Sequence, residues 1–270
     1  GIKSPIGMSG VRMEAKVHII TCANDMAKNL VKCVERCELN VDQLIFSALA
    51  SSYAVVTDDE KELGICVVDI GAGTMDISVF TGGALRHTAV IPVAGNQVTS
   101  DIAKIFRTPL SHAEDIKVQY ACALRNLVSM EENIEVPSVG GRPARSMSRH
   151  TLAEVVEPRY QELFELIHEE LREAGLEEQI AAGFVLTGGA AKMQGVIEFA
   201  EEIFQMPVRL AQPYEVVGLK EYVNDPTYST VVGLLHYGIL AAEQENKEDK
   251  SSDGVTGLWS RLTAWFKGEF

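Results

Sequence analysis

The segment V-V-D-I-G-A-G-T-M-D at 67–76 constrains the fold most, because an apolar run delivers a carboxylate directly into a glycine turn. Such a run predicts a buried strand, and Gly71 and Gly73 permit a tight turn after it. Backbone N–H groups in that turn can approach phosphate oxygens, Thr74 adds a hydroxyl donor, and Asp69 can hold Mg²⁺ through water. The segment predicts phosphate binding, although a plain β-hairpin with a glycine-rich turn fits the same residues.

A second glycine turn, T-G-G-A-A at 187–191, follows another short apolar segment much later in the chain. Residues 184–186 predict a buried strand before this turn, and residues 194–204 predict a helix after it. Two such units can face one nucleotide. The expected nucleotide site therefore includes Asp69, Gly71, Ala72, Gly73, Thr74, Thr187, Gly188 and Gly189.

Apolar and polar segments alternate along the chain in a way that favours α/β architecture. Strands are expected at 17–22, 41–46, 65–70, 77–80, 85–93, 184–186 and 208–210. Helices are expected at 24–37, 47–56, 152–171, 194–204 and 229–242, and an acidic turn at 57–62. The polar stretch at 129–150 is expected to connect two helical regions of a separate subdomain.

The composition excludes several classes of function. The 270-residue chain is 46% apolar, enough for a sizeable core, and its net charge of −14 disfavours nucleic acid as a partner. Five scattered cysteines without a CxxC pair indicate reduced thiols and a cytoplasmic compartment. No apolar run is long enough to cross a bilayer. The histidines and cysteines never combine at metal-binding spacing.

The two glycine turns together resemble the phosphate-binding and adenosine-binding motifs of the superfamily of actin, DnaK-type chaperones and sugar kinases. Between them, A-E-D-I-K at 113–117 resembles the A-E-x-I-K helix of bacterial actins and chaperones. The resemblance implies ATP and Mg²⁺ as ligands, with Glu114 and Lys117 along the ribose and base. An exposed i, i+3 salt bridge between these two residues is the plainer alternative.

Within this superfamily the chain resembles FtsA, through S-G-V-R-M-E-A-K-V-H-I-I-T-C, V-P-S-V-G-G-R-P-A-R-S and Y-S-T-V-V-G-L-L-H-Y-G. The resemblance covers essentially the whole chain and implies an actin-like (ribonuclease H-like) α/β fold, with one and a partial domain of the two-lobed architecture and a carboxy-terminal amphipathic helix. It divides the chain into 1–22, the end of subdomain IC; 23–60 and 216–242, parts of IA; 61–110 and 178–215, IIA; 111–177, IIB; 243–254, a disordered linker; and 255–270, a membrane-targeting helix.

The resemblance also implies partners, because FtsA proteins form actin-like filaments and bind the tail peptide of the tubulin-like FtsZ on subdomain IIB. It implies an ATP-binding protein that anchors the FtsZ ring (Z ring) to the cytoplasmic face of the inner membrane at the septum and recruits later divisome proteins. Arg142, Arg145 and Arg149 are expected to meet acidic groups of the FtsZ peptide, and a solvated loop is the alternative.

Two departures from the superfamily pattern bear on ATP chemistry. S-A-L-A-S-S at 47–52 replaces the bacterial-actin E-P-M-A-A-A, so serine stands where an acid would orient water. We therefore expect ATP binding with weak or no ATPase activity. The first phosphate loop of the superfamily, D-x-G-[S/T], occurs nowhere before Asp69. Because the sequence opens with Gly1, we expect a longer protein that supplies this loop; a chain complete as it stands would bind nucleotide far more weakly.

The last residues form an amphipathic pattern after the polar linker. Apolar side chains recur on one helical face at Leu258, Trp259, Leu262, Trp265 and Phe266. Tryptophan suits the headgroup boundary, so this helix is expected to lie in the plane of an anionic membrane as a weak, reversible anchor. Filament assembly would strengthen attachment by linking many tails. A helix docked on the protein's own surface is the alternative.

Two other functions share part of this pattern. A soluble small-metabolite kinase of the same superfamily would carry both glycine turns, and a phosphorylation assay with small metabolites would reveal it. A chaperone-like ATPase would need a peptide-binding domain after the nucleotide-binding one, where this sequence has only the linker and 255–270.

Overall fold

The computed structural model describes residues 7–15, 17–214, 216, 218 and 223–243. The chain divides into two compact units, Gly1–Leu44 and Ile45–Phe270, and each is described by itself. In the first unit, helix α1 (Asn24–Glu35) buries none of its side chains. Among the described residues of that unit there is no second helix or strand to cover it.

The sequence predicts strands at 17–22 and 41–46, but neither segment forms a strand or any other regular secondary structure. A strand is stable only where a neighbour pairs with its backbone N–H and C=O groups. Within the described part of the chain, neither segment has such a neighbour. These two predictions are therefore wrong. Both segments are as apolar as a buried strand, but no strand in the described part of the chain pairs with either of them.

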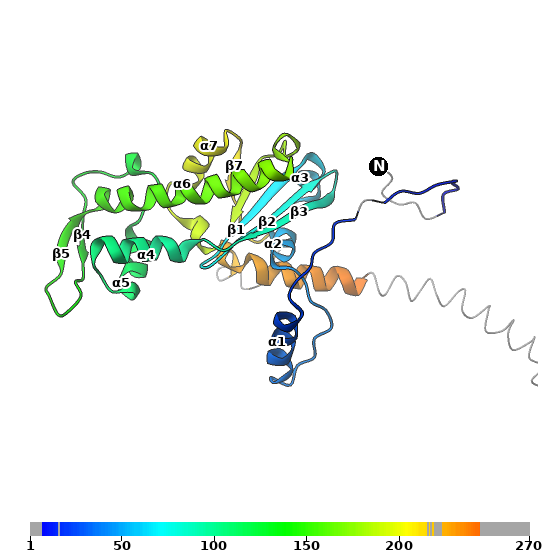
Figure 1. Cartoon of the computed structure of the whole chain (residues 1–270), viewed down its shortest axis with the longest axis horizontal. Coiled ribbons are helices and arrows are strands. Elements are labelled where there is room, and N and C mark those ends of the chain that lie inside the picture. Colours follow the sequence, from blue (N-terminus) through cyan, green and yellow to red (C-terminus); the bar gives the residue numbers. More distant parts are fainter. Residues whose placement is uncertain (1–6, 16, 215, 217, 219–222, 244–270) are drawn as a thin grey trace, which may run out of the picture. The chain divides into compact units, whose positions relative to one another are not determined.

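The second unit is built on a five-stranded sheet with the order β3-β2-β1-β6-β7 (Figure 1). Its strands are β1 (Ile65–Ile70), β2 (Met75–Thr81), β3 (Ala84–Ile91), β6 (Phe184–Thr187) and β7 (Val208–Leu210). The first three form an antiparallel meander, and β6 joins parallel to β1, with β7 parallel to β6. This mixed sheet confirms the predicted α/β architecture.

Helices cover both faces of the sheet (Figure 1). They are α2 (Ser47–Val55), α4 (Gly95–Phe106), α5 (Leu110–Tyr120), α6 (Arg149–Ala174), α7 (Val196–Phe204) and a helix at 229–243. Alternate residues of β1 enter two cores: Cys66, Val68 and Ile70 pack with α4 to α7. Ile65 and Val67 pack with α2 and the helix at 229–243. Burial on both faces explains why β1 reads as a continuous apolar run.

The polar stretch at 129–150 forms a β-hairpin, which the sequence did not predict. Strands β4 (Asn133–Val136) and β5 (Arg145–Ser148) pair antiparallel, and β5 leads directly into α6. Ser148 caps that helix by accepting a hydrogen bond from His150 N at 3.2 Å, and left-handed Gly175 ends it. These caps make α6 longer than the predicted 152–171.

No helix in the described ranges, α6 included, is long and apolar enough to cross a membrane.

A short helix, α3 (Asp58–Leu63), replaces the acidic turn predicted at 57–62. Thr57 and Glu60 form a capping box, in which Thr57 N donates to Glu60 Oε2 at 2.8 Å and Glu60 N donates to Thr57 Oγ1 at 3.3 Å. Arg209 also donates to Glu60, from Nε to Oε1 at 2.9 Å. Burial would raise the pKa of Glu60, but the hydrogen bonds from Thr57 and Arg209 lower it.

The helix at 229–243 crosses α2 with no room for a side chain at the contact. A Cβ on Gly233 would stand 1.7 Å from the carbonyl oxygen of Ala50. Close to this crossing, His236 Nδ1 lies 3.2 Å from the carbonyl oxygen of Tyr53. Glycine at 233 therefore fixes how closely the two helices approach.

We predict that Gly233→Ala lowers the free energy of unfolding by about 2 kcal/mol, because the added methyl group forces the two helices apart. Gly238→Ala in the same helix is the matched control, since a Cβ there has nothing within 4 Å. That change should raise stability by up to ~1 kcal/mol through helix propensity. Urea denaturation measures both variants, and equal effects would contradict the crossing described above.

Candidate functional site

The parallel pairing of β1 with β6 brings the two glycine turns to the same edge of the sheet. In this register Asp69 lies opposite Thr187, so the turns leave from neighbouring strand ends. Gly188 has a φ of +88°, and a Cβ there would be 2.3 Å from Asp69 Oδ1. Only glycine permits both this conformation and this approach. Two segments far apart in the sequence thus form one site.

The turn after β1 presents backbone donors at its tip. Two of its carbonyl oxygens accept hydrogen bonds from the start of α4: Gly71 O accepts from Gly95 N at 3.2 Å, and Ala72 O accepts from Asn96 N at 2.7 Å. In contrast, the N–H groups at 72–74 have no hydrogen-bond acceptor among the described residues, and these residues are exposed. Successive free N–H groups in a turn form an anion-binding concavity.

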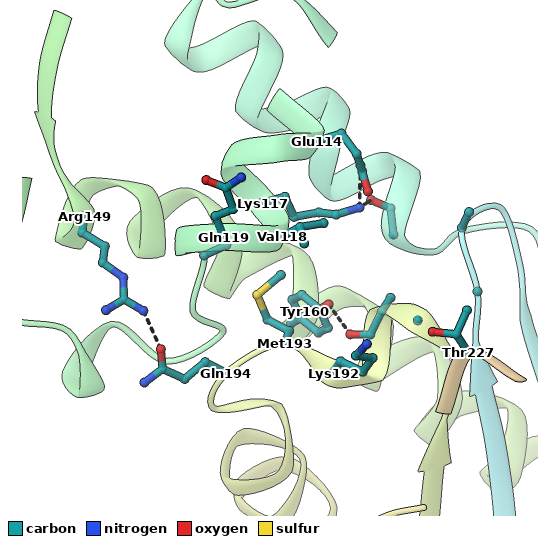
Figure 2. Close-up of a pocket in the computed structure, with 16 residues that line it drawn as sticks. Glu114, Lys117, Val118, Gln119, Arg149, Tyr160, Lys192, Met193, Gln194 and Thr227 are labelled. Atoms are coloured by element: carbon teal, nitrogen blue, oxygen red, sulfur yellow. Dashed lines mark hydrogen bonds and ion pairs between the residues drawn. The ribbon is translucent and has the colours of Figure 1, made fainter. Parts of the chain in front are cut away.

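A cavity of ≈ 560 Å³ opens beside these turns (Figure 2). Five of the residues predicted for nucleotide binding line it, namely Gly71, Ala72, Glu114, Lys117 and Gly189. The other predicted residues, Asp69, Gly73, Thr74, Thr187 and Gly188, are not on its wall. The structure therefore joins three separate sequence motifs around one space: both glycine turns and the A-E-D-I-K segment.

Lys117 and Glu114 belong to this cavity as a fixed ion pair on α5, with Lys117 Nζ 2.7 Å from Glu114 Oε2. Lys117 also donates to Thr99 Oγ1 at 2.9 Å and to Gly95 O at 3.2 Å, and Thr99 Oγ1 lies 2.5 Å from Glu114 Oε2. Burial alone would raise the pKa of Glu114, but the hydrogen bonds from Lys117 and Thr99 lower it. The two residues do form the i, i+3 salt bridge that was the plainer alternative. The pair differs from an ordinary surface salt bridge, because only 11% of the Lys117 side chain is exposed.

Asp69 ties two helices to the end of β1. Its Oδ2 accepts a hydrogen bond from Ser51 Oγ of α2 at 2.6 Å and another from Thr230 Oγ1 at 3.1 Å. Ser51 and Thr230 are also 2.9 Å apart through their hydroxyl oxygens. The Asp69 carboxylate is thus oriented at the edge of the site by hydroxyl groups from α2 and the helix at 229–243.

Thr187 has a comparable structural position at the end of β6. Its buried hydroxyl lies 2.6 Å from Ser229 Oγ and donates to Ala211 O at 3.0 Å. In this arrangement the side chain faces the interior, while Gly189 begins the 3₁₀ turn that reaches the cavity.

Asp76 is a second carboxylate at this site that the sequence reasoning missed. The β1–β2 register places it opposite Asp69, and Ser47 Oγ donates to its Oδ2 at 3.1 Å. Burial raises the pKa of Asp76; the Ser47 hydrogen bond opposes this shift and the nearby Asp69 adds to it. The sequence pattern could have revealed Asp76, because a four-residue turn between two paired strands places Asp69 and Asp76 opposite each other.

The three arginines expected to contact a partner lie in different surroundings. Arg142 is exposed in the turn between β4 and β5. Arg145 donates to Phe106 O, next to the end of α4. Arg149 begins α6, lines the cavity and donates to three acceptors. The expected membrane residues Leu258, Trp259, Leu262, Trp265 and Phe266 lie outside the described residues.

Other cavity residues had no motif to reveal them. Tyr160 on α6 is buried and donates its hydroxyl to Ala190 O at 2.7 Å, and burial raises its pKa. Lys192 forms an ion pair with Asp225 at 2.5 Å. Burial would raise the pKa of Asp225, but hydrogen bonds from Lys192 and Thr227 lower it to about 2. These contacts depend on tertiary packing, which spacing in the sequence does not show.

The described residues contain no group of three or more His, Cys, Asp or Glu side chains placed to hold a metal ion. The acidic groups near the glycine turn are the opposed pair Asp69 and Asp76. Carboxylates of this kind suit Mg²⁺, which keeps several of its waters and takes few ligands from the protein.

Comparisons with known proteins agree with the motifs. The family model "Cell division protein FtsA" matches residues 66–233. The chain is 58% identical over 279 residues to the cell division protein FtsA of Escherichia coli strain K12. That match covers 100% of this chain but 66% of the relative, so the chain spans about two thirds of the relative's length.

Solved structures share the fold at low sequence identity. The ADP-bound crystal structure of MreB5 from Spiroplasma citri matches with a TM-score of 0.67 and 20% identity, covering 83% of this chain and 68% of that one. The MamK double helical filament matches with a TM-score of 0.61 and 18% identity, covering 80% and 65%. The fold is therefore actin-like, as the sequence motifs predicted.

We predict that Asp76→Asn raises the free energy of unfolding at pH 8, and that this gain shrinks as the pH falls to 4.5. A raised pKa means that the folded state binds a proton more tightly than the unfolded chain. The stability that Asp76 contributes is thus present at low pH and lost as the pH rises through its folded pKa. Urea denaturation across this range measures the effect.

Asp59→Asn is the control for this prediction, because Asp59 is an exposed carboxylate on α3. It should give no comparable gain at pH 8. An Asp76→Asn chain that is no more stable than the unaltered chain at pH 8 would contradict the assignment of a burial penalty to Asp76.

Proposed function

The chain belongs to the FtsA family of cell division proteins, and from this membership we propose that it binds ATP in the cavity beside the two glycine turns. We further propose that the complete protein links FtsZ polymers to the cytoplasmic face of the inner membrane at the division septum. The observation that carries ATP binding is the meeting of both turns with Glu114 and Lys117 around one space.

The residues of the site fit a nucleotide in size and chemistry. A volume of ≈ 560 Å³ lies within the ~300 to 1,000 Å³ range of small-molecule sites. The free N–H groups at 72–74 suit phosphate oxygens, and Glu114 and Lys117 suit the hydroxyl groups of the sugar. Asp69 is the residue that would hold Mg²⁺, through water, with Asp76 beside it. Bound ATP would supply a charged polyphosphate and its metal ion, and these would hold the two glycine turns and α5 in one arrangement.

Weak or no hydrolysis is part of this proposal. Ser47 and Ser51 each donate a hydrogen bond to one of the two carboxylates, Asp76 and Asp69. A serine hydroxyl is a poor general base, so α2 offers no acid-base group to activate a water molecule. ATP would then act mainly as a switch for polymerisation.

We also propose that the protein assembles into actin-like filaments, and both the family and the fold support this proposal. MamK, which shares the fold, is known as a double helical filament. Linking many copies in a filament converts weak single contacts with FtsZ or lipid into stable attachment. Recruitment of later division proteins would use the same assembled surface.

The β4–β5 hairpin is the surface we propose for the FtsZ tail peptide. Its Arg142 is exposed, whereas Arg145 and Arg149 already donate to acceptors of this chain. Arg142 is therefore the arginine best placed to meet an acidic group of a peptide, and the other two would shape the hairpin around it.

Attachment to anionic lipid is proposed for the amphipathic pattern at 255–270. Two tryptophans on its apolar face suit the headgroup region, and Arg261 and Lys267 supply modest attraction to anionic headgroups. A single tail of this kind would bind reversibly, which makes filament assembly part of the anchoring mechanism.

We predict that Lys117→Met weakens binding of MgATP by at least ~10-fold, because it removes a largely buried cation from the cavity wall and leaves the Glu114 carboxylate without its ion-pair partner beside the nucleotide. Lys104→Met, on the exposed side of α4, is the matched control and should leave affinity unchanged. Isothermal titration calorimetry measures both, and thermal unfolding checks that both fold. No ATP binding by a protein that includes the first phosphate loop, or equal affinity in the two variants, would refute the site.

We also predict that the full chain co-sediments with anionic liposomes in the presence of ATP and that the double change Trp259→Glu and Trp265→Glu abolishes this binding. The charged side chains would remove the apolar face from the headgroup region. The matched control, Trp259→Phe and Trp265→Phe, should keep most of the binding. Co-sedimentation of the glutamate variant at the level of the unaltered chain would refute the anchor, and phosphorylation of a small metabolite would favour the kinase.

A further inference from the structure

The cavity continues past Glu114 and Lys117 into an end that the contacts proposed so far do not use. Lys117 is hydrogen-bonded to Gly95, and Gly95 in turn contacts the first glycine turn, so Lys117 lies next to that turn. Figure 2 shows Arg149 and Gln194 at the end of the cavity opposite Thr227. A nucleotide with its phosphates at the turn and its sugar beside Lys117 would place its base at this end.

Arg149 holds the side chain of Gln194 in one orientation. The Arg149 guanidinium donates to Gln194 Oε1 at 2.5 Å, to Tyr120 O at 2.7 Å and to Glu132 Oε2 at 2.7 Å. A guanidinium can only donate hydrogen bonds, so the amide must present its oxygen to Arg149. The amide NH₂ group of Gln194 is then turned away from Arg149 and is available as a donor.

The main chain of Gln194 is fixed as well. Gln194 forms a β-bridge with Cys122, and its carbonyl oxygen accepts from Ala123 N at 2.8 Å. The next residue, Gly195, has a φ of +77°, and a Cβ there would meet Leu127 Cδ1 at 3.0 Å. Both the backbone and the amide plane of Gln194 are therefore fixed before any ligand binds. A ligand that uses this amide would lose less binding free energy to ordering the side chain.

Apolar side chains complete this end of the cavity. Val118 on α5 lines the cavity with 74% of its surface exposed, and Met193 lines it next to Gln194. A planar, aromatic ring is the kind of group that covers exposed apolar surface and still offers polar atoms along its edge. This combination of one oriented donor with apolar neighbours fits a nucleobase.

We propose that Gln194 determines which base the site accepts, by donating its amide hydrogen to N1 of adenine, and that Arg149 is the positioning residue for this contact. The inference rests on the proposed binding of ATP. Adenine has an acceptor nitrogen at N1, whereas guanine has a donor N–H at the same place. A donor fixed by Arg149 therefore favours adenine, and an acceptor at position 194 would favour guanine.

The test compares the affinities of MgATP and MgGTP for the full chain by isothermal titration calorimetry. The unaltered chain should prefer ATP. Gln194→Glu replaces the donor with an acceptor of the same length and keeps the contact with Arg149, so the ratio of ATP to GTP affinity should fall at least ~10-fold. Gln194→Met removes the amide, and Arg149→Met leaves the amide of Gln194 free to rotate. Both variants should give intermediate ratios.

Gln205→Glu is the matched control, because Gln205 follows α7 away from the cavity and donates to Glu202 O. It should leave the ratio unchanged. If Gln194→Glu weakens both nucleotides equally, or changes neither, Gln194 does not select the base and ATP binding stands alone. If a protein that includes the first phosphate loop binds no ATP, both this inference and the proposed nucleotide site are overturned.

Discussion

The parallel pairing of β1 with β6 is the interaction on which the rest of the structure depends. It sets Asp69 opposite Thr187, and with them the two glycine turns that follow each strand. Parallel neighbours end at the same edge of a sheet, so loops after both strands must meet there. Gly188 completes the arrangement, because any side chain at that position would collide with Asp69 and Ile70.

The same strand ends also hold the helix at 229–243. Thr230 donates to Asp69, and Ser229 contacts Thr187, so consecutive hydroxyl residues join both strands to the first turn of that helix. Thr227, two residues earlier, lines the cavity. A short segment therefore touches the site at one end and begins a helix at the other. In the proposed function, this helix leads along the chain toward the segment at 255–270.

The sequence predicted the parts of this fold that depend on local pattern. β1, β2 and β6 follow from apolar runs that end in glycine turns, and Glu114 and Lys117 followed from a family motif. The strands expected at 17–22 and 41–46 failed because pairing needs a partner that apolar composition does not reveal. The contact of Arg149 with Gln194 joins α6 to the loop before α7, and no spacing rule connects those positions.

Charge places a further constraint on the proposed nucleotide site. The chain carries a net charge of −14, which repels an anionic ligand at a distance, although salt confines that repulsion to about 8 Å at physiological ionic strength. Inside the cavity, Lys117 lies 2.7 Å from Glu114, so the charge of the cation is largely balanced before a ligand arrives. In the proposed site, the remaining attraction for phosphate would come from the N–H groups at 72–74 and from a divalent cation held near Asp69. Affinity in such a site would depend more on the geometry of one glycine turn than on the number of basic residues, so the acidic composition of the chain is compatible with the proposed binding of a polyphosphate.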